Sequence, residues 1–550
     1  MACPLGDPLM PALRKFAFFA ALATLSGLAM LSGCTSSPDL KVADPSPSSP
    51  TPTPAPAPNP LAITTGALAA ATVGSAYSAP IVASGGNTPY AFSATGLPSG
   101  LTIAGPTGTI SGTPAANTSG TTSITITVTD STQPTALTAS ATLSLTINPA
   151  AVAPPPTAGS CKVMSLGANA SLNGYVPFPA ANVWNTDISA APLDPNNTLI
   201  TTAAGFTGLH LHHNFSSVAA GNTGIPYIVV DSSTTPLVPI NVIDYAGQSD
   251  VANAPYPLDA PIEGSPADCS GWPDTYVGDS HVLVLDRATC ALYETYNTHR
   301  CNGAWNSSSE TIWDMDNYEQ RPWSWTSADA AGLPIFSGLI RYDEVQSGAI
   351  NHAIRFTMQQ TKNDANNGYF VYPASHAAGT VWGVNNVMGM RIRLKAAFDI
   401  SAFSKTNQII LTAMKKYGMI LADNGGYFFF QGVADPRWND SDLLNLDTIQ
   451  SSNFEVVQMT PAFPGYDSAS APTGPPPTIN SFTASPATVS AGSPVTFTWT
   501  TTNDSYDFID KLGAVRGGTV TFTPTATATY TLNATNQYGR STKQLTLTVH

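Results

Sequence analysis

Alternation of apolar and polar residues, typical of β-strands, runs through most of this chain. In residues 123–129 and 141–147, Ile, Val and Leu alternate with Thr and Ser, the period of a half-buried strand. Further along, similar patterns predict strands at 225–231, 238–244, 281–286, 291–297, 340–345, 353–361, 369–373 and 390–397. The gap between Asp286 and Cys290 has the length of a hairpin turn, so the strands on either side of it are expected to pair.

Two segments have a helical period instead. Between 407 and 417 the apolar residues share one face, Lys415 and Lys416 lie in the last turn, and Gly418 follows as a C-terminal cap. A shorter helix is expected at 440–449. Many strands, which we expect to be antiparallel, with one or two helices predict a mainly β protein. Its central part is expected to be a β-sandwich or jelly-roll-like domain.

Three Pro-rich stretches divide the chain. Residues 36–60 are rich in Pro, Ser and Thr and favour an extended polyproline conformation, and shorter Pro runs occupy 154–156 and 475–477. We therefore predict a linker at 34–60, a first module at 61–149, a principal domain at 158–473 and a last module at 479–550.

The first module carries two Gly-containing phrases, Gly96-Leu-Pro-Ser-Gly-Leu-Thr102 and Gly108-Thr-Ile-Ser-Gly-Thr-Pro114. They resemble the immunoglobulin-like modules of bacterial surface proteins, and the last module looks similar through 490–499 and 528–534. The resemblance implies two immunoglobulin-like sandwiches flanking the larger domain, each acting as a spacer.

The N-terminus has the pattern of an export signal. Arg14 and Lys15 precede an apolar run that ends in Leu31-Ser-Gly-Cys34. This tetrad resembles the lipobox of bacterial lipoproteins, which implies cleavage after residue 33 and lipidation of Cys34; an ordinary cleaved signal is the alternative. Thr35 favours the outer membrane or cell surface, with the lipid anchor as the only membrane contact.

Four cysteines remain in the exported chain, all in the principal domain: Cys161, Cys269, Cys290 and Cys301. An even number in an exported protein predicts two disulfides, with three connectivities open. Zinc binding is the weaker alternative, because the chain has no Cys-x-x-Cys pair.

The same domain holds eight of the nine Trp residues, and 14 Lys and Arg against 28 Asp and Glu. Outside it, positive and negative residues balance. An acidic chain without a basic surface excludes nucleic acid as a partner. The chemistry of this protein is therefore expected between residues 158 and 473.

Carboxylates and histidines supply the catalytic candidates. Asp279 and His281 are two residues apart, so in a strand they point to one face, and Glu294 lies in the next strand. Glu263, in a Gly-containing turn, is a further candidate, because sugar-bond hydrolysis needs two nearby carboxyl groups. His352 alternates with apolar residues, which favours a buried role, but in a cleft it would suit proton transfer. Ordinary surface or turn acids are the competing interpretation.

Two further patterns suit a saccharide ligand. Trp305, Trp313, Trp323 and Trp325 fall within 21 residues, and indole rings stack on sugars. Arg391 and Arg393 share a strand face with Lys395 and would hold an acidic polysaccharide, or pair with cross-strand acids. Packing of the indoles within the domain is the alternative for the Trp group.

No cofactor is required by these patterns, but a divalent metal is compatible with one of them. His210 and His212 form a His-x-His pair on one strand face, with His281 or Glu294 as the third ligand. The leading hypothesis is a surface-tethered hydrolase or lyase acting on an extracellular polysaccharide. A non-catalytic glycan-binding adhesin and a metal-dependent enzyme are the alternatives.

Overall fold

We describe a computed structural model of the chain, which covers residues 59–115, 118, 120–148, 160–217, 223–264, 279–317, 320–364, 367–378 and 383–550. The chain divides into two compact units, Met1–Ala150 and Ala151–His550. Within the described residues no helix is long and apolar enough to cross a membrane. The predicted signal and linker lie outside these residues.

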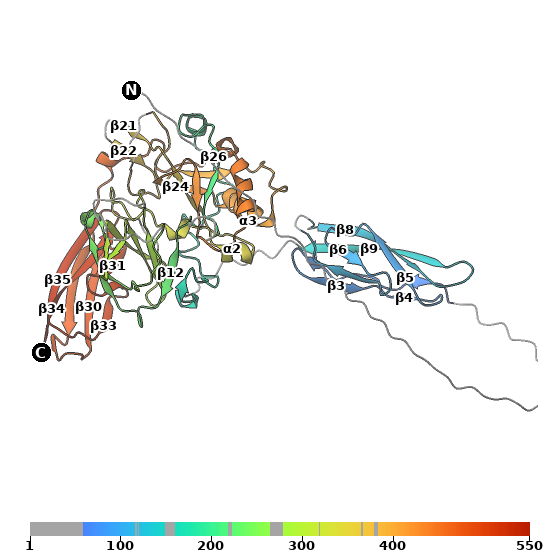
Figure 1. Ribbon diagram of the computed structural model, residues 1–550, viewed down its shortest axis with the longest axis horizontal. Coiled ribbons are helices and arrows are strands. Elements are labelled where there is room, and N and C mark those ends of the chain that lie inside the picture. The colour runs from blue at the N-terminus through green and yellow to red at the C-terminus, as the bar shows by residue number, and fades with distance from the viewer. Residues whose placement is uncertain are drawn as a thin grey trace, which may run out of the picture. The chain divides into compact units, whose positions relative to one another are not determined.

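The first unit is a two-layer β-sandwich (Figure 1). One sheet has the order β2-β9-β8-β5 and the other β3-β7-β6, with a separate pair β1-β4. Residues of β8 and β9 alternate between buried and exposed, as their sequences predict. The strands are β1 Ala62–Ile63, β2 Ala71–Thr72, β3 Tyr77–Pro80, β4 Ala83–Ser84, β5 Ala91–Thr95, β6 Leu101–Ile103, β7 Thr109–Gly112, β8 Gly120–Thr129 and β9 Thr138–Asn148.

The Gly phrases of this unit bring β6 and β7 close together. A Cβ atom on Gly100 would lie 2.0 Å from the carbonyl oxygen of Thr113, and one on Gly112 would lie 2.1 Å from that of Gly100. Both glycines also have positive φ angles, 90° and 138°. The two positions therefore require glycine for steric and conformational reasons.

The second unit is built on a five-stranded sheet, β10-β12-β15-β16-β19, and a six-stranded sheet, β11-β25-β20-β24-β23-β26. A four-stranded sheet, β14-β13-β18-β17, and a small sheet, β21-β22-β27, complete its central part. These strands are β10 Gly167–Ala168, β11 His212–Asn214, β12 Tyr227–Val230, β13 Val238–Val242, β14 Asn253–Ala254, β15 Val282–Asp286, β16 Ala291–Tyr296, β17 His299–Cys301, β18 Ala304–Ser307, β19 Ser309–Asp314, β20 Ile354–Met358, β21 Asn363–Asp364, β22 Asn367–Phe370, β23 Arg391–Leu394, β24 Met419–Asn424, β25 Phe429–Gln431, β26 Phe454–Val456 and β27 Tyr466–Asp467.

The five-stranded sheet is covered on both faces, which explains why β15 is buried along its whole length. Leu283 and Leu285 face the largest hydrophobic core, whereas Val282 and Val284 face a second core that includes Trp305. As predicted, β15 and β16 form an antiparallel hairpin. Most strand pairs of this central part are antiparallel, as expected, but β12 pairs with β15 and β20 with β24 in parallel.

Helices are few, as the sequence predicts. They are α1 Asn197–Thr201, α2 Tyr342–Ser347, α3 Lys405–Lys416 and α4 Asp440–Leu443, the last continuing as a 3-10 helix over Leu444–Thr448. The predicted helices at 407–417 and 440–449 are therefore present. Ser404 caps α3 by accepting a hydrogen bond from the backbone N–H of Asn407.

The strand predicted at 340–345 is wrong, because α2 occupies most of it. The Glu344 carboxylate accepts a hydrogen bond from the backbone N–H of Arg341, which satisfies the first turn. Gly348, with φ of 97°, ends the helix. A local side-chain cap therefore outweighs the β-like apolar pattern of this short segment.

The C-terminal residues form a second sandwich, with sheets β28-β30-β33 and β29-β35-β34-β31-β32. The chain is therefore mainly β, with an immunoglobulin-like sandwich in the first unit and a sandwich at the C-terminus. The strands are β28 Thr478–Ser485, β29 Thr488–Val489, β30 Val495–Thr502, β31 Tyr506–Ile509, β32 Gly513–Val515, β33 Thr519–Phe522, β34 Ala528–Asn536 and β35 Gly539–Val549.

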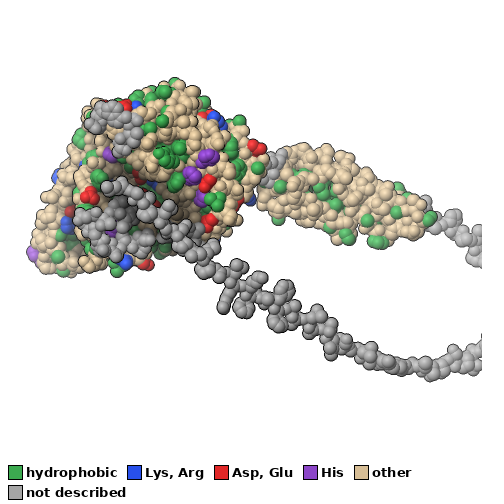
Figure 2. All heavy atoms as spheres, turned by 45° about the horizontal axis from the view of Figure 1, so that its top comes forward, with side chains coloured by type: hydrophobic (Ala, Val, Ile, Leu, Met, Phe, Trp, Pro, Cys, Tyr) green, Lys and Arg blue, Asp and Glu red, His purple; other side chains and the backbone are tan. Residues whose placement is uncertain are grey.

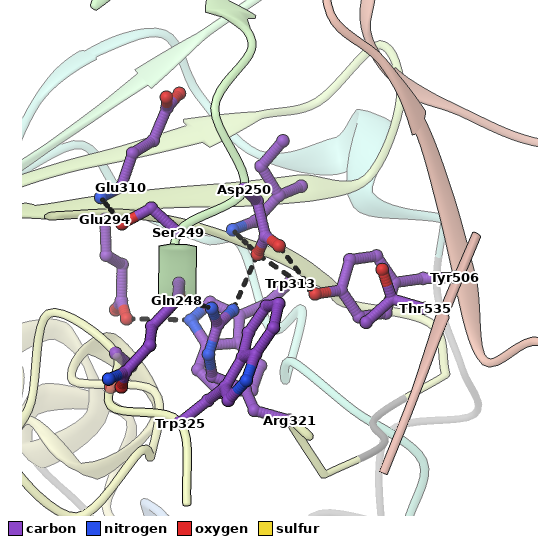
Figure 3. Close-up of polar contacts among 12 residues, drawn as sticks. Gln248, Ser249, Asp250, Glu294, Glu310, Trp313, Arg321, Trp325, Tyr506 and Thr535 are labelled. Carbon is purple, nitrogen blue, oxygen red and sulfur yellow. Dashed lines mark hydrogen bonds and ion pairs between the residues drawn. The ribbon is translucent and has the colours of Figure 1, made fainter. Parts of the chain in front are cut away.

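This sandwich packs directly on the central part of the second unit through a buried ionic cluster (Figure 3). Asp250, which is fully buried, accepts hydrogen bonds from Arg321 and Arg540 and from the Tyr506 hydroxyl. The guanidinium of Arg540 also lies 4.7 Å from the ring centre of Trp325. We call this group, Asp250, Arg321, Trp325, Tyr506 and Arg540, the junction cluster.

One disulfide joins Cys161 to Cys290, across 129 residues of chain. Cys301 is disulfide-bonded as well, and Cys269 lies outside the described residues. The three described cysteines of the principal domain are therefore disulfide-bonded.

Candidate active site

A pocket of about 310 Å³ opens where the two large sheets of the second unit approach each other. Asp423 and Asn424 come from the end of β24, Tyr296 ends β16, and Asp279 precedes β15. The loop after β19 supplies another wall. The lining residues are Tyr245, Asp279, Tyr296, Thr326, Ser327, Ala328, Ala330, His376, Ala378, Asp423 and Asn424.

His281 lies behind this pocket in a fixed orientation. Its Nδ1 lies 2.5 Å from Oε2 of Glu263, and its Nε2 lies 3.1 Å from the carbonyl oxygen of Ala328. Burial disfavours the charged imidazole, but the neighbouring Glu263 carboxylate outweighs it and raises the pKa of His281 to about 9. Asp279 joins the pair, and donor atoms of all three side chains lie within 4.8 Å of one another.

A second group of ionisable side chains surrounds Arg355. Its Nη2 and Nε donate to the two oxygens of Asp329, at 2.7 and 3.1 Å, and Nη2 lies 3.6 Å from Oδ2 of Asp423. Arg355 and Asp329 are buried, whereas the Asp423 side chain is 17% exposed. Desolvation and the negative charges of Asp329 and Asp279 raise the pKa of Asp423 well above its usual range, against the opposing effect of Arg355. The surroundings of Asp423 therefore favour the protonated form of its carboxyl group, which lines the pocket.

Three of the sequence candidates, Glu263, Asp279 and His281, thus come together, and Asp279 lines the pocket. Glu294 does not join them. Its carboxylate accepts hydrogen bonds from the backbone N–H groups of Ile335 and Phe336 and from the indole of Trp313. Burial raises the pKa of Glu294 to about 7, and its contacts place it in the hydrophobic core.

His352 belongs to a separate buried network beside α2. Its Nε2 lies 3.1 Å from Glu344, which also forms an ion pair with Arg341. Burial opposes ionisation of Glu344, but Arg341 and His352 keep the pKa of its carboxyl below the usual value. His352 is 2% exposed, in agreement with the buried role that its apolar neighbours favour.

The four clustered Trp residues do not form one exposed platform. Trp305 and Trp313 are 2% and 3% exposed and belong to the two cores of the second unit. Trp323 and Trp325 are half-buried and line a smaller pocket of about 230 Å³ beside Tyr538 of the C-terminal sandwich. Packing within the domain accounts for the first two rings, so the sugar-stacking expectation is restricted to Trp323 and Trp325.

The two arginines of β23 are engaged by the protein itself. Arg391 is buried and donates to the carbonyl oxygens of Thr186 and Tyr417, and burial lowers its pKa to about 10. Arg393 forms an ion pair with Glu455, on the paired strand β26, and also donates to backbone carbonyls. The cross-strand alternative describes Arg393 better than a polysaccharide clamp does.

His210 and His212 lie apart from the pocket, next to Asp447. The Nδ1 atoms of His212 and His213 lie 3.5 and 3.1 Å from its two carboxylate oxygens, while that of His210 lies 3.0 Å from its backbone carbonyl. Figure 2 shows His side chains gathered beside acidic ones on one face of the molecule. Among the described residues, neither His281 nor Glu294 comes together with these histidines as a third ligand.

Sequence reasoning missed Asp329, Arg355, Asp423 and His376. Asp423 had one visible signal, since it is an acid at the end of an apolar run, Met419-Ile-Leu-Ala-Asp423. Burial lowers the pKa of His376, whose Nδ1 donates to the carbonyl oxygen of Ala330 at 2.7 Å. Such a neutral imidazole faces the same pocket as Asp423.

Comparison with known proteins adds the nature of the first unit. A family model described as "Putative Ig domain" matches residues 59–148, in agreement with the Gly phrases of that segment. A search of curated proteins found no match. The first unit therefore contains an immunoglobulin-like domain, and the match does not extend to the second unit.

Solved structures resemble the chain only weakly. Two α-galactosidases from Bacteroides fragilis, each described as putative, match 16% of this chain at 22% and 20% identity, with TM-scores of 0.14. The matched part spans 17% of each of those chains. The N-terminal eight Ig domains of Down Syndrome Cell Adhesion Molecule align with 88% of this chain and 59% of theirs, at 10% identity and a TM-score of 0.12. Likeness at this level carries no argument about function.

Proposed function

We propose that this protein is a cell-envelope enzyme that hydrolyses an extracellular polysaccharide, with the pocket between the two large sheets as its active site. The observation that carries the proposal is the meeting of two unlike carboxyl groups in that pocket. Asp423 is kept protonated by burial and by Asp329, whereas Asp279 is exposed. Hydrolysis of a glycosidic bond uses one carboxylic acid and one carboxylate in this way.

In this mechanism Asp423 donates its proton to the glycosidic oxygen as the bond to the anomeric carbon breaks. Asp279 accepts a proton from the water that adds to that carbon, so the two carboxyl groups exchange protonation states and then re-equilibrate with solvent. Arg355 and Asp329 hold Asp423 in place. Tyr245 and Tyr296 offer aromatic surface to the sugar rings, and Asn424 and Thr326 offer polar groups to the hydroxyls.

The N-terminal pattern supports attachment to the cell envelope. The lipobox-like Leu31-Ser-Gly-Cys34 and the Pro-rich linker place Cys34 as the lipidated residue and the outer membrane or cell surface as the location. Replacement Cys34→Ala should release the protein from the membrane fraction of expressing cells. Unchanged membrane association of that variant would contradict lipid anchoring.

The enzymatic proposal is tested by incubating the purified chain with a panel of neutral and acidic polysaccharides. We expect new reducing ends with at least one of them, and a loss of roughly a hundredfold or more in Asp423→Asn and Asp279→Asn. Asp447→Asn, which changes an acid outside the pocket, should keep full activity. Appearance of unsaturated sugar ends would assign a lyase instead.

Binding of a polysaccharide without any cleavage would favour the alternative function, a glycan-binding adhesin. Isosteric Asn variants are used because they preserve side-chain volume in and beside the pocket. Equal activity of the wild type and both pocket variants would refute the assignment of Asp423 and Asp279 as the acid and base.

A further inference from the structure

Glu263, Asp279 and His281 form a compact set of metal-ligating side chains at the wall of the pocket. Each can offer one donor atom, and these atoms lie within 4.8 Å of one another. Two carboxylate oxygens and one imidazole nitrogen are a common three-residue ligand set, which leaves further positions for water or substrate. We propose that these three residues bind one divalent transition-metal ion, of the Zn²⁺ or Mn²⁺ type.

The orientation of His281 is the first support. Its Nε2 lies 3.1 Å from the carbonyl oxygen of Ala328, and a carbonyl can only accept, so Nε2 carries a hydrogen. Nδ1 carries the second hydrogen, which it donates to the carboxylate of Glu263, and an ion bound at Nδ1 would replace this proton. Imidazoles that bind metals are held in this manner, with the second ring nitrogen donating to a carbonyl or carboxylate.

Charge around the site is the second support. Four carboxyl side chains contribute to the electrostatics of this region: those of Glu263, Asp279, Asp329 and Asp423. Among the described residues, Arg355 is the one guanidinium close to them. Arg355 is already committed to Asp329 by two hydrogen bonds. An ion that replaced the Nδ1 proton of His281 would lie close to the carboxyl groups of Glu263 and Asp279, which would balance its charge.

The pocket supplies access. Asp279 is exposed and lines the opening, so an ion could be exchanged with solvent, while His281 is 1% exposed and fixes the inner side. Binding requires a small adjustment, because two tetrahedral ligands of one ion are separated by roughly 3.4 Å. The present separation of Nδ1 and Oε2 is 2.5 Å. The Glu263 side chain, which is 18% exposed, has room to move outward.

The mixed donor set decides the class of ion. Ca²⁺ and Mg²⁺ prefer oxygen ligands alone, whereas imidazole favours Zn²⁺ and its neighbours, and carboxylates also suit Mn²⁺. In the proposed hydrolase, a bound ion would lower the pKa of the water that attacks the sugar. This catalytic role of the ion rests on the proposed function. Its binding can be measured without any substrate.

The experiment uses the full chain after removal of metals with a chelator and dialysis. Zn²⁺ and Mn²⁺ are titrated separately by calorimetry, with Ca²⁺ and Mg²⁺ as comparison ions. We expect one Zn²⁺ or Mn²⁺ ion per chain, and an affinity at least about tenfold lower in Glu263→Gln and in Asp279→Asn. Asp447→Asn is the matched control, because it alters the separate group of His212 and His213, and it should leave this affinity unchanged.

Absence of binding at millimolar Zn²⁺ and Mn²⁺ would overturn the proposal, as would binding that is lost in Asp447→Asn but retained in both pocket variants. The metal-free variants should unfold at the same temperature as the metal-free wild type. Their lower affinity then reflects the loss of a ligand and not a loss of folded structure. A chain that binds the ion but cleaves no polysaccharide would refute the proposed hydrolase while the metal site stands. Conversely, if the chelated chain cleaves polysaccharide and binds no ion, the metal site is refuted and the proposed hydrolase stands.

Discussion

The replacement Asp250→Asn is expected to weaken the attachment of the C-terminal sandwich more than any single surface change. Asp250 is completely buried and is the shared counter-ion of Arg321 and Arg540 in the junction cluster. Its Oδ2 accepts hydrogen bonds from Nη1 of Arg321 at 2.6 Å and from the backbone N–H of Ile312 at 3.1 Å (Figure 3). Asparagine has nearly the same shape, so the change is essentially electrostatic.

The magnitude follows from the burial of Arg321, which is 1% exposed. Without the carboxylate of Asp250, its charge keeps hydrogen bonds to neutral acceptors, the carbonyl oxygens of Thr326 and Gln248. Removing one partner of a buried ion pair costs about 3–5 kcal/mol, because the other charge is left uncompensated. Arg540, whose side chain is 14% exposed, recovers part of its hydration and adds less.

The measurement is urea unfolding of the full chain followed by Trp fluorescence, since Trp325 lies in the junction cluster and Trp499 in the sandwich core. Asp364→Asn is the control, because Asp364 pairs with Lys362 but is 43% exposed, and it should cost less than about 1 kcal/mol. A double variant, Asp250→Asn with Arg321→Met, should regain part of the loss. Equal effects of Asp250→Asn and Asp364→Asn would show that the junction cluster does not hold the sandwich.

Three further predictions concern stability. Replacing Cys161 and Cys290 by Ser opens a loop of 129 residues and should lower the free energy of unfolding by up to about 5 kcal/mol, measured against the untreated wild type in urea. Trp305→Ala should destabilise the second unit by about 3–5 kcal/mol, and unchanged stability with weaker glycan binding would contradict its core position. Burial raises the pKa of Asp507 from 3.8 to about 6, so the folded state binds this proton more tightly than the unfolded state does. The free energy of unfolding therefore falls as the pH rises from 3.8 through 6. Asp507→Asn should remove this fall of about 1–2 kcal/mol, allowing for partial solvent exposure; an identical pH dependence in the variant would refute it.

The features that sequence reasoning placed correctly are local ones. Strands β15 and β16 are joined by a short turn, so their alternation and spacing sufficed to predict the pairing. Asp279 and His281 are two residues apart, so their proximity needed no knowledge of the whole fold. The helix at 407–417 likewise depends on its own period and caps.

The features that it missed depend on pairing between distant segments. Arg355 meets Asp423 because β20 and β24 lie side by side in parallel, although 68 residues separate the two side chains in the sequence. Such crossovers leave no local signal. Burial of Trp305 likewise depends on a distant segment, because Phe508 of the C-terminal sandwich belongs to the same core.

Asp286 and Asp423 show why a local pattern cannot assign chemistry to an acid. Each ends an apolar strand, Val282-Leu-Val-Leu-Asp286 and Met419-Ile-Leu-Ala-Asp423. Asp286 accepts hydrogen bonds from the backbone N–H groups of Ser232 and Ala288 and from the hydroxyl of Thr289, so its side chain is held by the turn that it closes. Asp423 instead faces the carboxyl of Asp329, whose charge favours the protonated form. The same sequence pattern therefore leaves one carboxyl group bonded to the turn that follows it, and the other facing a second carboxyl group that a distant segment supplies.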